Sequence, residues 1–124
     1  MGDDKLFGGT GNDTLVGGTG KDTFTFDTAL NGSSNVDRLT DFSVVDDTIQ
    51  LENAVFAALT TTGLLQAAAF FIGTAAHDSS DRIIYNSANG ALLYDADGLG
   101  GSAGIKFATL GTGLALTNSD FRVV

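Results

Sequence analysis

Three aspartates near the start of the chain, Asp4, Asp13 and Asp22, are nine residues apart and occupy the same place in a glycine-rich phrase. The phrase is complete twice, as GGTGNDTLV and GGTGKDTFT. Glycine permits positive φ and a tightly coiled backbone, so several carbonyl oxygens can point inward beside one carboxylate. An all-oxygen cage suits a hard cation, above all calcium. The phrase therefore predicts a Ca²⁺-binding turn.

The spacing of the phrase also predicts the element that carries it. A nine-residue repeat is too short for a helical repeat and fits a turn of about six residues plus a strand of about three, as in a parallel β-helix or β-roll. With two repeats per coil, Asp4 and Asp22 stack on one edge and can share an ion. Asp13 lies on the opposite edge and needs a partner from the next coil. Three residues can supply it: Asn31, Asp27 and Asp37.

The pattern changes from Asn35 onward. VDRLTDF and DDTIQLE alternate apolar with polar residues as half-buried strands do, while NAVFAAL and LLQAAAFF predict short helices near 53–60 and 64–70. DRIIYN and ALLYD flank the turn SANG and predict a hairpin, and GIKFATL predicts a further strand. We expect a mainly β fold in one domain, 1–124: a short parallel β-roll over 1–34 that continues into an antiparallel β cap with short helices over 35–124.

Composition limits the partners that the domain can take. Fifteen Asp and Glu against six Lys and Arg give a net charge of −9, and the basic residues are scattered singly. Nucleic acid and anionic membrane surfaces are repelled by such a chain, so neither nucleic-acid binding nor stable membrane insertion is expected. The start, MGDDKLFGG, has no apolar run and is neither a signal peptide nor a membrane span. With no cysteine, disulfides and Cys-based zinc sites are excluded.

The two complete phrases resemble the calcium-binding nonapeptide G-G-x-G-x-D-x-U-x of the RTX family of bacterial secreted proteins. In that family the ions lie between stacked turns of a right-handed parallel β-roll. Later segments look like the C-terminal domain of serralysin-type proteases and other RTX exoproteins. These segments are DTFTF, DRLTDFSVVDDTIQLENA, FFIGTAAHDSSDRIIYN, GALLYDADGLGG, IKFATL and DFRVV.

The resemblance implies a set of calcium ligands. Carboxylates are implied at Asp4, Asp13 and Asp22. Backbone carbonyls are implied at Gly8, Thr10, Gly17 and Thr19, with Gly9, Gly11, Gly18 and Gly20 as further candidates. An extra ion beneath the roll is one interpretation of Asp37, Asp41, Asp46 and Asp47, and solvated loop residues are the other. By similarity, Asp37 is the best single candidate for a ligand among these four.

The resemblance also implies a function: the calcium-binding C-terminal domain of a larger exoprotein, secreted and extracellular, that folds or is stabilised on binding Ca²⁺. Its last residues are implied to contribute to a type I secretion signal, read by the ABC transporter of the secretion machinery. These are Asp120, Phe121, Val123 and Val124, with Arg122 as an unexpected charge. A catalytic or adhesive domain is expected upstream, and Met1 meets the repeat in mid-register, which suggests a longer parent.

Two other functions stay open. The first is a carbohydrate- or surface-binding adhesion module on the same roll, with an aromatic surface made by Phe70, Phe71, Tyr85 and Tyr94. The second is an enzyme, built on the only histidine, His77, or on Ser102 in GGSAG. A nucleophile elbow needs a strand before the serine and a helix after it, whereas a polar turn precedes Ser102 and a strand-like run follows. The sequence therefore favours a domain that is not an enzyme.

A second possible calcium motif is DADG, Asp95 to Gly98, which matches the start of an EF-hand loop. Such a loop requires glutamate at its twelfth position, where this chain has Lys106. The segment is therefore predicted to be a turn.

Overall fold

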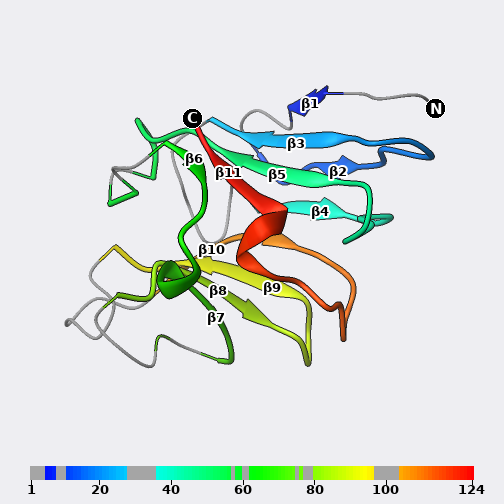
Figure 1. The fold of residues 1–124 in the computed structure, drawn as a ribbon. Coiled ribbons are helices and arrows are strands. Elements are labelled where there is room, and N and C mark those ends of the chain that lie inside the picture. The colour runs from blue at the N-terminus through cyan, green and yellow to red at the C-terminus, as the bar shows by residue number, and fades with distance from the viewer. Residues whose placement is uncertain are drawn as a thin grey trace.

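The computed structural model describes residues 5–7, 11–27, 36–56, 58–59, 62–74, 76, 80–96 and 104–124. Over these residues the chain is mostly β, with two short 3-10 helices. Figure 1 shows the N-terminal strands at one end of the molecule and the β7–β9 region at the other. The strands form two sheets.

The first sheet is built largely from parallel pairs. In order of pairing, its strands are β1 (Lys5–Phe7), β3 (Thr23–Phe26), β5 (Thr48–Leu51), β11 (Phe121–Val123) and β6 (Gly63–Leu64). All neighbours are parallel except β11 and β6, which are antiparallel. The C-terminal strand therefore lies inside this sheet, between two strands from the middle of the chain.

The second sheet joins the roll to the cap. In order of pairing, its strands are β2 (Thr14–Leu15), β4 (Asp37–Leu39), β10 (Ile105–Thr109), β9 (Ala91–Tyr94), β8 (Ile83–Asn86) and β7 (Phe70–Ile72). The pairs β8–β9 and β9–β10 are antiparallel, and the other three pairs are parallel. The cap thus combines antiparallel and parallel pairing.

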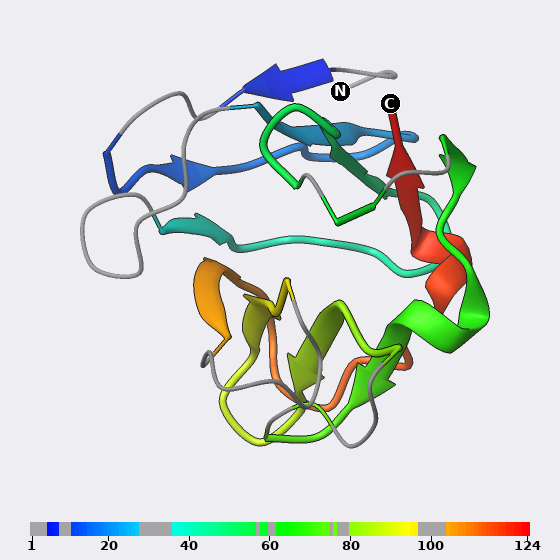
Figure 2. The same cartoon turned by 90° about the vertical axis from the view of Figure 1, so that its left-hand side faces the viewer.

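The register of the first strands confirms the parallel β-roll. Lys5 on β1 lies opposite Thr23 on β3, an offset of eighteen residues or two nonapeptides. On the other sheet, β2 pairs in parallel with β4. The same parallel stacking continues past residue 34, through β5 to β11 and through β4 to β10. Figure 2 shows these strands stacked in succession from the N-terminal end.

The core between the two sheets is aromatic. The rings of Phe26 and Phe107, from opposite sheets, are 5.2 Å apart in an edge-to-face arrangement, and Phe56 contacts both Phe107 and Tyr94. Phe24, at the apolar position of the repeat, is fully buried and packs near Phe42. Such pairs contribute about 0.5–1.5 kcal/mol each beyond the burial of their area. The repeat thus places its apolar residue inside and its glycine turn at the edge.

The helices predicted from 53–60 and 64–70 are wrong for the described residues. Residues 53–56 form turns, and the second segment contains only the 3-10 helix η1 (Ala67–Ala69). Gly63, with φ of +105°, and strand β7 interrupt the helical pattern, since Phe70 and Phe71 pair with β8. The apolar residues Phe56, Leu59 and Leu65 are instead buried from segments without regular secondary structure. The other 3-10 helix, η2 (Asn118–Asp120), leads into β11.

The predicted hairpin is confirmed, and Gly90 ties it to β10. Asn86 pairs with Ala91 across the turn. Gly90 has φ of +80°, and its carbonyl accepts the N–H of Leu110 at 2.7 Å. A Cβ at this position would lie 2.0 Å from the carbonyl oxygen of Leu110. Only glycine fits here, because both the backbone conformation and the close approach exclude a side chain.

We expect Gly90→Ala to destabilise the domain more than Gly113→Ala. Gly113 also has a positive φ, +65°, but has open space where the Cβ would stand. The strain of the left-handed conformation costs about 1–2 kcal/mol in either variant, and the clash adds about 1–3 kcal/mol for Gly90→Ala alone. Chemical denaturation measures the difference, and equal losses would show that the contact with Leu110 is unimportant.

Candidate calcium site

Asp13 and Asp37 meet across two neighbouring coils. Asp13 precedes β2 and Asp37 begins β4, and the parallel register of these strands sets the two residues opposite each other. The N–H of Asp13 donates to Oδ1 of Asp37 at 3.1 Å, and the N–H of Arg38 donates to the carbonyl of Asp13 at 2.7 Å. Of the three partners predicted for Asp13, the structure therefore brings Asp37 to it. Asp27 is exposed, and Asn31 lies outside the described residues.

The Asp13–Asp37 pair is electrostatically unfavourable by itself. Asp37 is 4% exposed, and desolvation by burial raises its pKa to about 6. The N–H of Asp13 lowers the pKa of Asp37 in part, whereas the negative charge of Asp13 raises it further. Oδ2 of Asp13 is buried and accepts no hydrogen bond from the part of the chain that the structure describes. A cation stabilises a buried carboxylate such as Asp37 that lies beside a second, partly buried one.

On the other edge of the roll, Asp22 lies against the backbone of its own turn. Its side chain is 1% exposed, and a Cβ at Gly17 would stand 2.4 Å from Oδ2 of Asp22. Glycine at position 17 therefore lets the carboxylate approach the backbone. Three other glycines of the repeats, unlike Gly17, have positive φ, as the tight coil requires: Gly11, Gly18 and Gly20. Thr19, between two of them, is exposed.

Asp47 continues the aspartate column of Asp22. The register of β3 on β5 sets Thr23 opposite Thr48, and hence Asp22 opposite Asp47. Oδ1 of Asp47 accepts the N–H of Asp22 at 3.0 Å, and its Oδ2 accepts the N–H of Ser43 at 2.8 Å. The sequence offered Asp47 only as one of four acids that are candidates for holding an extra ion. It did not align Asp47 with Asp22, because the two are twenty-five residues apart, which is not a multiple of nine. The sequence signal for Asp47 is the similarity of DTIQL to DTFTF, in which Asp47 takes the place of Asp22.

The remaining two acids of this segment differ from each other. Asp41 accepts hydrogen bonds from the N–H groups of Gly17 and Gly18. Asp46 is exposed, as expected for a solvated loop residue. Within the described ranges, no group of three or more His, Cys, Asp or Glu side chains could hold a metal ion. Carbonyl oxygens must therefore complete any cage that uses these carboxylates, as is usual for calcium.

Several predicted ligands lie outside the described residues: Asp4, Gly8, Gly9 and Thr10. The eighteen-residue offset of β1 on β3 equals the spacing between Asp4 and Asp22 in the sequence. The donor set that is described, carboxylate and backbone oxygen without nitrogen or sulfur, fits calcium. The unsatisfied Oδ2 of Asp13 supports the same fit.

The other candidate residues fall elsewhere. Asp95 is buried directly after β9, whereas His77 and Ser102 are outside the described residues. At the C-terminus, Phe121 and Val123 are buried in β11 and Arg122 is exposed. Burial raises the pKa of Asp120, although its hydrogen bond from Thr117 opposes the shift.

Residues 1–28 match the family model of the RTX calcium-binding nonapeptide repeat (4 copies). The start of the chain therefore carries RTX calcium-binding repeats. RTX repeats of this kind bind Ca²⁺, are structural and not catalytic, and are typical of secreted proteins. No match was found among curated proteins. In the described part of the chain, no helix has the length and apolar character needed to cross a membrane.

We expect Asp37→Asn to stabilise the calcium-free protein at neutral pH by about 1 kcal/mol, because the amide oxygen still accepts the N–H of Asp13 while the buried charge is removed. The pKa of Asp37 is about 6 in the folded protein and 3.8 for an ordinary aspartate. Protonated Asp37 therefore stabilises the folded protein fully below pH 3.8, and this stabilisation is lost as the pH rises through about 6. Wild type should therefore lose stability relative to Asp37→Asn between about pH 4 and about pH 7.

Urea denaturation in EDTA across this range measures the effect, with Asp27→Asn as the control at an exposed acid. If the free energy of unfolding had the same pH dependence in wild type and in Asp37→Asn, the claim that Asp37 is a destabilising buried charge would be wrong.

Proposed function

We propose that this chain is the C-terminal domain of a larger RTX exoprotein, that Ca²⁺ stabilises it outside the cell, and that type I secretion exports it. The contact of Asp13 with Asp37 carries this proposal. The two carboxylates come from different coils, so an ion between them joins segments twenty-four residues apart in the chain. Such an ion binds only the folded state.

The stability that calcium binding adds is large enough for folding to depend on whether the chain is inside or outside the cell. At ten times a Kd of ~10⁻⁴ M, one site that exists only in the folded state adds about 1.4 kcal/mol. A few such sites approach the ~5–15 kcal/mol that separates folded from unfolded domains. In the cytosol, where calcium is scarce, this contribution disappears and the carboxylates repel one another. Folding is thereby delayed until export.

The position of the C-terminus supports export before folding. Phe121 and Val123, which we propose to belong to the secretion signal, are 0% and 1% exposed in β11. Strands β5 and β6 cover both edges of this strand. An ABC transporter that reads these side chains must therefore meet them in the unfolded chain. The low calcium of the cytosol keeps that form available.

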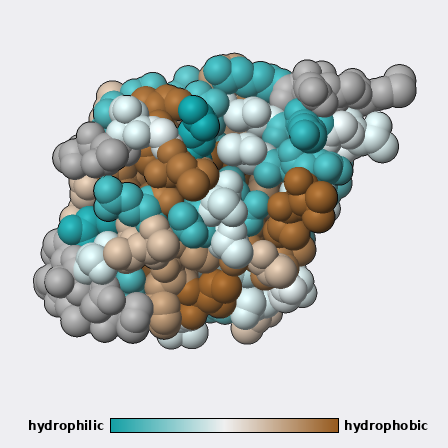
Figure 3. Space-filling view, in the orientation of Figure 1, coloured by the Kyte–Doolittle hydropathy of each residue, from teal (hydrophilic) through white to brown (hydrophobic). Residues whose placement is uncertain are grey.

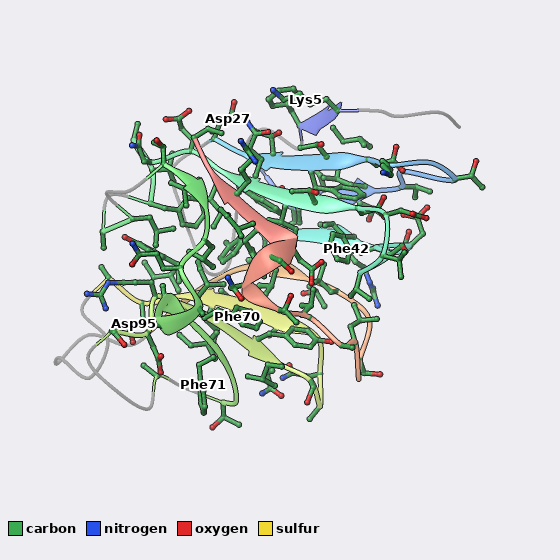
Figure 4. All side chains as sticks on the ribbon, in the orientation of Figure 1. Lys5, Asp27, Phe42, Phe70, Phe71 and Asp95 are labelled. Carbon is green, nitrogen blue, oxygen red and sulfur yellow. The ribbon has the colours of Figure 1, made fainter. Side chains whose placement is uncertain are left out.

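The adhesion alternative lacks its aromatic surface. Tyr85 and Tyr94 are buried in the core, and the ring of Phe70 lies 5.2 Å from that of Phe121. Figure 4 places Phe71 at the far end of the molecule from β1. Figure 3 shows apolar groups on one face of the molecule separated by hydrophilic ones. The calcium-stabilised secretion domain is therefore the function that the residues support best.

We expect Ca²⁺ to raise the melting temperature of the wild-type protein, and Asp13→Ala to lose most of that increase. The variant removes one of the two carboxylates that the ion joins, so each site lost reduces the calcium-dependent stability by about 1–2 kcal/mol. Circular dichroism melts with calcium and with EDTA measure the two increments. Asp27→Ala, at an exposed acid of the same charge, should keep the full increase. A wild-type protein indifferent to calcium would falsify the proposed function.

A further inference from the structure

The turn that carries Asp22 is held from the following coil by Asp41. Oδ1 of Asp41 accepts the N–H of Gly17 at 3.0 Å, and Oδ2 accepts the N–H of Gly18 at 2.6 Å. One carboxylate therefore binds two consecutive amides of the glycine-rich phrase with both of its oxygens. Hydrogen bonds to an ionised acceptor are about twice as strong as neutral ones. Asp41 thus fixes the orientation of two successive peptide groups.

That orientation decides where the carbonyl of Gly17 points. A trans peptide group is planar, with its N–H and C=O directed oppositely, and the described chain has no cis peptide bond. The N–H of Gly18 points to Asp41, so the carbonyl of Gly17, in the same peptide group, points away from Asp41. Asp41 lies in the link between β4 and β5, and β3 separates β5 from β1. The Gly17 carbonyl is therefore turned toward the side of the preceding coil.

The carboxylate of Asp22 lies next to this peptide group. A Cβ on Gly17 would stand 2.4 Å from Oδ2 and 2.8 Å from Cγ of Asp22. A backbone carbonyl and a carboxylate from one turn are thereby gathered in a small space. These are the two kinds of oxygen that a calcium cage uses. Asp41 holds the peptide groups beside this space through its two hydrogen bonds.

We propose that Asp41 is a positioning residue for the calcium site at the Gly17–Asp22 turn. It acts through the amides of Gly17 and Gly18 and preorganises the Gly17 carbonyl for the ion before the ion arrives. This inference rests on the proposed calcium-binding function and assigns Asp41 no ligand role. A purely structural tie between coils would stabilise the calcium-free and calcium-bound protein equally. A positioning residue contributes more to the calcium-bound protein, because it also lowers the ordering cost of binding.

The test is a denaturation series in EDTA and in saturating calcium, together with calorimetric Ca²⁺ titration, for wild type, Asp41→Ala and Asp41→Asn. Asp41→Ala frees both amides and should weaken calcium affinity about tenfold, the fold-change that corresponds to one lost charge-assisted hydrogen bond. Asp41→Asn keeps one acceptor oxygen and should lose roughly threefold. Stability should fall more in calcium than in EDTA for both variants.

The matched control is Asp46→Ala, which removes the same charge from the same link at an exposed side chain. It should change affinity by less than about twofold, since exposed charges are screened. The proposal is overturned if Asp41→Ala and Asp46→Ala bind calcium equally, or if the Asp41 variants lose equal stability with and without calcium. If Asp41→Ala does not fold, the same comparison with Asp41→Asn decides. If the wild type binds calcium and both of these results are found, only the role of Asp41 is rejected. If the wild type binds no calcium, the proposed function itself is rejected.

Discussion

The parallel register of one coil on the next is the constraint on which the rest of the molecule depends. It sets Asp13 opposite Asp37 on one edge and Asp22 opposite Asp47 on the other. Like charges stacked in this way oppose folding unless something positive or hydrogen-bonding lies between them. Backbone amides serve this purpose in part, since the N–H of each upstream aspartate donates to the carboxylate of the downstream one.

The two edges satisfy this constraint differently. At the Asp22 edge, Asp47 has an N–H on each carboxylate oxygen, and Asp41 binds two further amides, so carboxylates close the link between these coils without metal. At the Asp13 edge, Oδ2 of Asp13 has no hydrogen-bond partner among the described residues, and burial raises the pKa of Asp37. Under the proposed function, an ion that joins these two coils therefore adds most stability at the Asp13 edge, where hydrogen bonds are missing. Roll and cap share the aromatic core between the sheets, since Phe26 of the roll packs against Phe107 of the cap.

The repeats could be predicted from the sequence because glycine, aspartate and one apolar residue recur with a strict period. This period alone gave the parallel roll, two repeats per coil, and the candidates Asp13 and Asp22. The next coil could not be placed in the same way, since its turns are longer and its aspartates follow at twenty-four and twenty-five residues. Asp41 and Asp47 were therefore visible only as acids in a mixed segment. The helix predicted over 64–70 was wrong because the pairing of Phe70 with β8 outweighed the helical spacing.

The most direct measurement is the location of the ion in crystals grown with Ca²⁺ or a lanthanide substitute, using anomalous scattering. The stacked-carboxylate account predicts a peak between the turns of Asp13 and Asp37, with carboxylate oxygens at about 2.3–2.6 Å from it. Absence of a peak there, with the two carboxylates turned apart into solvent, would contradict it.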